Sequence, residues 1–268
     1  MPPQFSQLVQ LKAGAEEPSV FIAHGIGGDV LEFSGLARNI QSQHPIRGLR
    51  AKGADGLDKP LTRIEDMAQY HLQAIKDLQP QGPYLLIGYS LGGLLMLEIA
   101  QRLSADGEKI GLLVMLDTYP HRRFLSRRQR LSLTTSLLRH HLSTLRRLPK
   151  RRALSYFLDR TGRRLRSAGR DNSDSVRVET TGKSRPTWDS DDLAWKQYNP
   201  RFYSGKIRFV KAETSSYFPR NPAAVWAKLA NEVEVETTPG DHEGIISTHI
   251  ESLATILSRY LRETSCSE

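Results

Sequence analysis

One segment, YLLIGYSLGGLLMLE at residues 84–98, joins two apolar runs through a single serine, Ser90. The residues before the serine predict a buried strand, and the residues from 91 to 107 predict a helix. Gly88 and Gly92 lie two positions to either side of the serine. A tight strand-to-helix turn strains the serine backbone, and bulky neighbours at those two positions would collide with it. The pattern therefore predicts a turn that lifts the Ser90 hydroxyl to the carboxyl edge of a sheet.

Short apolar runs alternate with helical patterns on both sides of the middle of the chain. Besides the opening segment, buried strands are predicted at 20–24, 111–117, 206–213 and 232–238, and helices at 31–40, 62–78 and 249–263. Alternation of this kind is typical of a parallel sheet covered by helices. We therefore predict an α/β fold, with a mostly parallel sheet and helices on both of its faces.

The middle of the chain differs in composition from the rest. Residues 121–170 hold 16 lysines and arginines against one acid, Asp159, a net charge of +15, whereas the remainder holds 22 basic and 28 acidic residues. Leucines in this part follow a helical face, and the polar stretch 167–186 predicts a mobile loop. Because strands flank this region, we expect one domain spanning 1–268 with an arginine-rich helical lid insertion at about 119–200. The basic segment favours an acidic partner, although an ordinary solvated helical face explains it equally well.

Several classes of protein are excluded by the composition. The single cysteine, Cys266, lies in a polar tail, so one chain cannot build a disulfide framework. No run of 18 apolar residues exists, so no transmembrane helix is expected. The first ten residues lack the basic start and apolar stretch of a secretory signal. These observations predict a cytoplasmic protein.

A serine becomes an effective nucleophile only beside a base that an acid orients. His242 lies in the turn-like stretch TTPGDHEG, after a late strand and before the last helix, which is where the order serine, acid, histidine requires the base. His249 is the nearest rival, at the start of a helix, where a cap or a solvent-facing role is expected. His44 and His71 are interpreted as ordinary surface or half-buried residues.

Two carboxylates compete for the role of the acid. Asp117 ends the strand that follows the serine's helix, and Glu213 ends the next strand. We favour Asp117, because its side chain is shorter and the predicted strand before it is more uniformly apolar. The alternative interpretation of Asp117 is a cap for the next segment. For the oxyanion hole we expect two backbone N–H donors. One is Leu91, directly after the serine, and the other is Ile26, in the glycine-rich loop AHGIGGD. His24, at the start of that loop, is interpreted as structural or pocket-lining.

Longer stretches carry a family resemblance: FIAHGIGGDVLEFSGLARNI, GLRAKGADG, QPQGPYLLIGYSLGGLLMLEIAQRL and LLVMLDTYP. They resemble the thioesterase domains that end nonribosomal peptide synthetases and polyketide synthases. The resemblance covers residues 6–120 closely and returns more weakly at YNPRFYSGKIRFVKAE and PGDHEGI. It implies an α/β-hydrolase fold and a Ser-His-Asp triad, in which Ser90 is the nucleophile and His242 the base. The arginine-rich insertion does not carry the family pattern beyond being a helical lid.

The resemblance also implies a substrate and a partner. The acyl, peptidyl or polyketide chain would arrive as a thioester on the phosphopantetheine arm of an acyl or peptidyl carrier protein, and no cofactor or metal would be bound. Carrier proteins are generally acidic, so the basic lid would serve as the docking surface. Release would follow by hydrolysis or by macrocyclisation.

Alternatives to this interpretation stay open. In the terminal branch of the family the acid follows the strand after the nucleophile helix, as Asp117 does, whereas in the stand-alone editing branch it follows the next strand, where Glu213 lies. The chain thus resembles the terminal type, either as a discrete enzyme or as an excised domain. An editing thioesterase or a carboxylester hydrolase with the same triad is the alternative enzyme. A module that binds nucleic acid or membrane is disfavoured, because arginine alone can bind phosphate without a triad. Neither the acyl chain nor the oligomeric state can be predicted.

Overall fold

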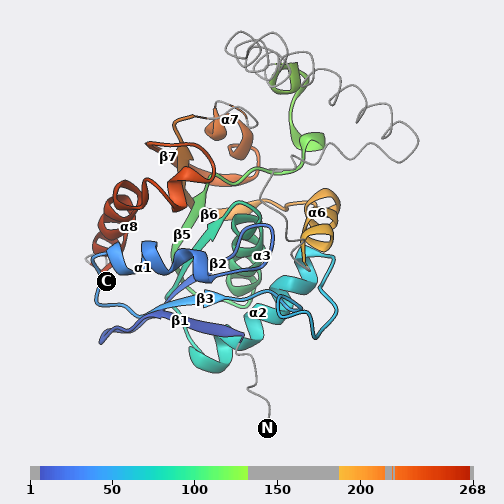
Figure 1. Ribbon diagram of the computed structural model, residues 1–268. Coiled ribbons are helices and arrows are strands. Elements are labelled where there is room, and N and C mark those ends of the chain that lie inside the picture. Colours follow the sequence, from blue (N-terminus) through green and yellow to red (C-terminus); the bar gives the residue numbers. More distant parts are fainter. Residues whose placement is uncertain (1–6, 132–186, 215–218, 220, 266–268) are drawn as a thin grey trace, which may run out of the picture. The chain divides into compact units, whose positions relative to one another are not determined.

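The computed structural model describes residues 7–131, 187–214, 219 and 221–265 (Figure 1). The chain divides into two compact units: a larger one of residues 1–125, 184–215 and 220–268, and a smaller one of residues 126–183 and 216–219. In the smaller unit, the Ser126 hydroxyl accepts from the Gln129 N–H at 3.2 Å and the Gln129 side chain accepts from the Ser126 N–H at 2.7 Å. This reciprocal pair caps a helical start.

Some predictions concern residues outside the described ranges. The loop expected at 167–186, most of the arginine-rich segment and Cys266 all fall there. The single domain with an insertion at about 119–200 stays a prediction.

Seven strands form the sheet of the larger unit, in the order β1-β3-β2-β4-β5-β6-β7. They are β1 (Leu8–Lys12), β2 (Val20–Ala23), β3 (Ile46–Leu49), β4 (Tyr84–Tyr89), β5 (Ile110–Leu116), β6 (Tyr203–Ala212) and β7 (Ala230–Thr238). All neighbours pair in parallel except the edge strand β1, which is antiparallel to β3. The predicted α/β fold with a mostly parallel sheet is confirmed, although β1 and β3 were not predicted.

Helices cover both faces of this sheet (Figure 1). They are α1 (Ser34–Asn39), α2 (Ile64–Leu78), α3 (Leu91–Ala105), α6 (Trp188–Gln197), α7 (Pro222–Trp226) and α8 (Ile250–Ser265), with short 3-10 turns η1 (Leu31–Phe33), η2 (Arg122–Phe124) and η3 (Gly244–Ile246). α1 packs against α8 on one face, and α2 packs against α3 on the other. Within the described residues, no helix is both long and apolar enough to span a bilayer.

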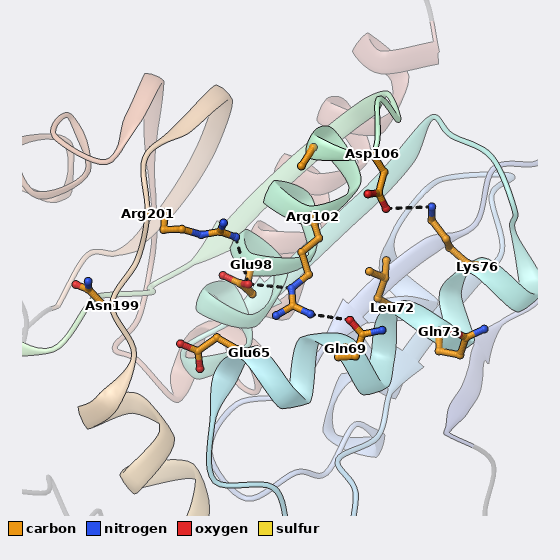
Figure 2. A pocket seen from close by; sticks show the side chains of 11 residues that line it. Glu65, Gln69, Leu72, Gln73, Lys76, Glu98, Arg102, Asp106, Asn199 and Arg201 are labelled. Atoms are coloured by element: carbon orange, nitrogen blue, oxygen red, sulfur yellow. Dashed lines mark hydrogen bonds and ion pairs between the residues drawn. The ribbon is translucent and has the colours of Figure 1, made fainter.

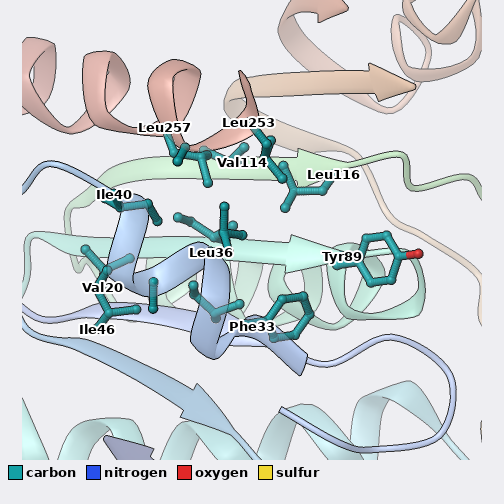
Figure 3. Packing of buried hydrophobic residues seen from close by; sticks show 14 of the residues in the cluster. Val20, Phe33, Leu36, Ile40, Ile46, Tyr89, Val114, Leu116, Leu253 and Leu257 are labelled. Atoms are coloured by element: carbon teal, nitrogen blue, oxygen red, sulfur yellow. The ribbon is translucent and has the colours of Figure 1, made fainter. Parts of the chain in front are cut away.

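The alternation of strand side chains explains why the central strands are apolar throughout. Leu85, Ile87 and Tyr89 of β4 belong to the core cluster that also contains Leu36 of α1 and Leu257 of α8. Figure 3 shows Tyr89 among the side chains of this cluster. Leu86 lies between Leu85 and Ile87 in sequence and is fully buried too, on the face where α3 packs. A strand buried on both faces has no polar side to expose. The sheet therefore fixes the carboxyl ends of β4 and β5 rigidly beside each other.

Candidate active site

Ser90 occupies the turn between β4 and α3 in a strained conformation. Its φ of 54° and ψ of −116° lie in a region that L-residues rarely adopt. The Ser90 N–H donates to the Leu116 carbonyl at 2.9 Å, which ties the turn to β5. A Cβ at Gly88 would lie 2.2 Å from the carbonyl oxygen of Gly92, and one at Gly92 would lie 2.4 Å from that of His24. Glycine is therefore required at both positions because backbone atoms approach too closely for any side chain.

His242 lies beside this serine, in the loop between β7 and η3. Its Nε2 is 3.0 Å from Ser90 Oγ, and its Nδ1 is 2.8 Å from Asp117 Oδ2. Because a carboxylate accepts hydrogen bonds, the Nδ1 proton of a neutral imidazole points to Asp117 and leaves Nε2 to accept from the serine hydroxyl. The arrangement is that of a nucleophile, a base and an orienting acid.

Asp117 directly follows β5 and is 1% exposed. Its N–H donates to the Val210 carbonyl at 2.8 Å, and its Oδ1 accepts from the Ala212 N–H at 3.4 Å. Its φ of 44° turns the chain sharply at the end of the strand. Glu213, the rival carboxylate, lies exposed beyond β6. The structure thus brings Asp117 to the histidine and leaves Glu213 at the surface.

The loop after β2 passes close to the serine, as the oxyanion-hole prediction requires. A Cβ at Gly25 would lie 3.6 Å from Ser90 Cβ and 2.9 Å from the Tyr89 ring. Ile26 is the next residue and is half-buried. Leu91 is the first residue of α3, where backbone N–H groups have no partner within the helix. Both predicted donors lie on segments that border Ser90, and their role stays a prediction.

Residues matched by a family model connect this geometry to known proteins. The model described as "Thioesterase domain" matches residues 18–261. The chain belongs to the thioesterase domain family. The resemblance seen in the sequence is confirmed, and so is the α/β-hydrolase fold that it implied.

Curated relatives of this thioesterase domain are much longer proteins. A dimodular nonribosomal peptide synthase of Bacillus subtilis (strain 168) is 39% identical over 114 residues, 42% of this chain and 5% of the relative. Enterobactin synthase component F of Escherichia coli (strain K12) is 36% identical over 116 residues, 43% of this chain and 9% of the relative. Polyketide synthase PksR of Bacillus subtilis (strain 168) is 35% identical over 147 residues, 55% of this chain and 6% of the relative. The chain thus spans less than a tenth of these three relatives.

Solved structures with the same fold include a thioesterase domain and a type II thioesterase. The NocB thioesterase domain, in covalent complex with a fluorophosphonate nocardicin G analog, has a TM-score of 0.64 at 21% identity, over 92% of this chain and 96% of that one. The type II thioesterase BorB, from the borrelidin biosynthetic cluster, has a TM-score of 0.67 at 16% identity, over 95% of this chain and 97% of that one. The likeness concerns the fold and does not distinguish a terminal thioesterase from a stand-alone editing one.

Tyr89, inside the serine motif, is a neighbour of the predicted triad that the sequence analysis did not single out. Its ring stacks on His242 with the centroids 4.9 Å apart, and its hydroxyl donates to the His242 carbonyl at 2.8 Å. Burial raises the pKa of the Tyr89 phenol, and nearby carboxylates, Glu32 and Asp117 among them, raise it further. The phenol therefore stays protonated and keeps donating. Its place next to Ser90 was the one available signal.

The predicted exposure of two other histidines is wrong. His44 and His71 are both buried, not surface or half-buried as expected. Burial lowers the pKa of His71 to about 3, and the neighbouring His24 lowers it too, so His71 is neutral at ordinary pH. His24 is itself 1% exposed and directly follows β2. His249 is exposed just before α8, and His242 alone of these five contacts Ser90 among the interactions described.

A separate groove of about 730 Å³ lies between α2, α3 and the segment after α6 (Figure 2). The buried Glu98 carboxylate accepts from Arg102 Nε at 2.9 Å, from the Tyr198 phenol at 3.1 Å and from Arg201 at 3.3 Å. These contacts tie the chain that leaves α6 to the helix that follows Ser90. Ser90 does not line the groove. Within the groove, Lys76 pairs with Asp106, and Arg102 and Arg201 pair with Glu98 (Figure 2). Among the described residues, no group of three or more His, Cys, Asp or Glu side chains could hold a metal ion.

Proposed function

We propose that this domain is a thioesterase that releases an acyl, peptidyl or polyketide chain from a carrier-protein thioester through an acyl-Ser90 intermediate. The observation that carries the proposal is the hydrogen-bonded series from Asp117 through His242 to Ser90, at 2.8 and 3.0 Å. Within a family of thioesterase domains, this series supplies the nucleophile, base and acid for acyl transfer.

In the first half-reaction, Ser90 Oγ attacks the thioester carbonyl carbon while His242 Nε2 takes the hydroxyl proton. Asp117 holds the imidazole in the required tautomer and stabilises the imidazolium that forms. The carbon–sulfur bond then breaks, and the imidazolium returns the proton to the departing phosphopantetheine sulfur. The products are a free thiol and an ester on Ser90.

The negative oxygen of the tetrahedral intermediate is stabilised by the N–H groups of Leu91 and Ile26. In the second half-reaction, His242 takes a proton from the incoming nucleophile and returns it to Ser90 Oγ as the ester bond breaks. A water molecule as nucleophile gives an acid, whereas an amine or hydroxyl of the bound chain gives a ring. No cofactor is needed for either step.

The position of the acid supports the terminal type of thioesterase, because Asp117 follows β5, directly after the nucleophile helix. We place the enzyme in the cytoplasm, as one domain with an arginine-rich lid at about 119–200. The +15 segment at 121–170 would attract an acidic acyl or peptidyl carrier protein, and the long synthetase relatives support a carrier as partner.

The experiment that tests the proposal is mass spectrometry of the intact protein after incubation with acyl thioesters of carrier protein and of N-acetylcysteamine. The wild type should gain the mass of the acyl group, and Ser90→Ala should not. An adduct that persists in Ser90→Ala would contradict the proposed nucleophile. Matched thioester and oxygen-ester substrates distinguish a thioesterase from a carboxylester hydrolase, since the latter would prefer the oxygen ester.

A further inference from the structure

Asp191, in α6, is a buried carboxylate that contacts the loop after β2. Its Oδ2 accepts from the Gly27 N–H at 2.8 Å, and the residue is 1% exposed. The two residues are 164 positions apart in sequence, so this hydrogen bond joins the last helix before β6 to the loop that passes Ser90. The backbone at Gly28 also passes close to the start of α6, because a Cβ added there would lie 3.1 Å from the Thr187 hydroxyl oxygen.

Stability alone does not account for a carboxylate at this position. Burial raises the pKa of the Asp191 carboxyl, and the nearby His24 and the Gly27 N–H offset this only in part. Asp191 Oδ1, Thr187 Oγ1 and His24 Nε2 are buried without a hydrogen-bond partner among the described residues. A buried polar group that lacks partners costs free energy, and a charged one costs more. A cluster kept at such a cost suggests a functional reason for the contact it makes.

α6 is held in place by other contacts. Trp195 Nε1 donates to the Tyr119 carbonyl at 3.0 Å, and the Arg123 guanidinium donates to the carbonyls of Gln197 and Tyr198 at 2.7 and 2.8 Å. These bonds lie at the far end of the helix from Asp191. The C-terminal end of α6 is therefore anchored without Asp191, and the Asp191–Gly27 bond joins the N-terminal half of the helix to the loop.

The loop itself is fixed on both sides of Ile26. On one side, Gly25 lies against the Tyr89 ring and Ser90, and on the other, the Gly27 N–H is held by Asp191. Glycine-rich backbone is otherwise free to sample many conformations, and ordering it costs conformational entropy. An oxyanion donor is effective only when its direction is set before the reaction.

We propose that Asp191 is a positioning residue, which holds the Gly27 N–H so that the Ile26 N–H stays directed at the oxyanion formed on Ser90. The inference rests on the proposed function and deepens it. It assigns to α6, at the end of the insertion, a part in the catalytic geometry that neither the serine motif nor the triad supplies.

The test compares Asp191→Ala and Asp191→Val, which remove the acceptor, with Asp191→Asn, whose amide oxygen can still accept from Gly27. Asp189→Asn, an exposed acid on the same helix, is the matched control. Two rates are measured: turnover of an acyl N-acetylcysteamine thioester, and labelling of Ser90 by a fluorophosphonate, which also places an oxygen in the oxyanion hole.

Without the acceptor, we expect kcat to fall about 10- to 100-fold, below the 10²–10³ seen when an oxyanion donor is removed outright. KM should change by less than about 2-fold, because the interaction is made in the transition state. Fluorophosphonate labelling should slow in parallel. Asp191→Asn should retain most of both rates, and Asp189→Asn should match the wild type.

Three results would overturn the inference: unchanged rates in Asp191→Ala and Asp191→Val, a loss confined to KM, or an Asp191→Asn as slow as Asp191→Ala. Rates are expressed per active site by titration, and the valine variant, which fills the side-chain volume, serves if the alanine variant folds poorly. Failure of the proposed function would give a different result. A wild type that does not turn over thioesters can still be labelled at Ser90, and the labelling rates of the Asp191 variants would then still report on the loop.

Discussion

The Tyr89 phenol donates a hydrogen bond to the backbone carbonyl of His242 at 2.8 Å, and the two rings stack with their centroids 4.9 Å apart. Tyr89 precedes the serine of the turn, whereas His242 lies in the loop after the last strand of the sheet. The Tyr89 side chain therefore contacts both the backbone and the ring of His242, and these two contacts hold the imidazole beside Ser90. The proposed nucleophile and its base are held by the same turn.

Removing the Tyr89 hydroxyl should separate its two contacts. Tyr89→Phe keeps the stacked ring and loses the hydrogen bond, so we expect a stability loss of about 1 kcal/mol and a several-fold lower kcat. Tyr89→Ala loses both contacts and should reduce kcat further, because the imidazole is then free to rotate away. Steady-state kinetics of both variants on one thioester check the order. Equal kcat values for Tyr89→Phe, Tyr89→Ala and the wild type would contradict this role.

Replacing each of the two candidate acids by its amide tests the assignment of Asp117. Asp117→Asn removes the acceptor that sets the His242 tautomer and should lower kcat by about 10⁴. Glu213→Gln alters an exposed residue beyond β6 and should leave kcat within about 2-fold of the wild type. Kinetics of the two variants at one pH decide the matter. The reverse ranking would move the acid to the later strand.

Much of this arrangement can be predicted from the sequence, and the limits have physical causes. The strands β2, β4 and β5 are buried on both faces, so their apolar runs are unmistakable, and Ser90 and Asp117 mark where two of them end. β1 escapes prediction because its side chains are only partly buried, and β3 because an arginine and a glycine interrupt its apolar residues.

Tertiary contacts explain the other failures. The burial of His71 depends on how α2 packs, which its local sequence does not reveal. Asp191 lies in the acidic run WDSDDL, and nothing there distinguishes the one carboxylate that reaches Gly27 from its neighbours. That contact spans 164 residues, and only the folded chain creates it.

The close approach at the serine turn can be tested with two glycines that differ in surroundings. In Gly88→Ala, the new Cβ would lie 2.2 Å from a backbone oxygen of Gly92, which cannot move without displacing α3. We expect a loss of about 3 kcal/mol or more in the free energy of unfolding. Gly56 has a φ of +79° with no atom within 4 Å of the added Cβ, so Gly56→Ala should cost only about 1 kcal/mol. Denaturant unfolding of both variants measures the difference, and equal losses would refute the steric explanation.

His71 should make the fold sensitive to acid. Burial lowers its pKa to about 3, from an ordinary histidine value of 6.5. Between these pH values His71 is protonated in the unfolded chain but not in the folded one. The contribution of this group to the free energy of unfolding is therefore fully present above pH 6.5 and declines as the pH falls toward 3. The slope from this one group is about 1.4 kcal/mol per pH unit. His71→Gln should flatten the curve of unfolding free energy against pH in this window, and His249→Gln, at an exposed site, should not. Parallel curves for His71→Gln and the wild type would show that folding does not lower the pKa of His71.

The charge of the segment 121–170 leads to a prediction about carrier docking. If its net charge of +15 attracts an acidic carrier, raising the salt concentration should weaken that attraction, since the screening length falls from about 10 Å at 0.1 M to about 3 Å at 1 M. KM for a carrier-bound thioester should therefore rise with salt, while KM for the N-acetylcysteamine thioester of the same acyl group barely changes. Replacing Arg163, Arg164 and Arg166 with glutamine should reduce the salt dependence of the first KM and leave the second unaffected. An equal response of the two substrates to salt would show that the basic segment is a solvated surface and takes no part in docking.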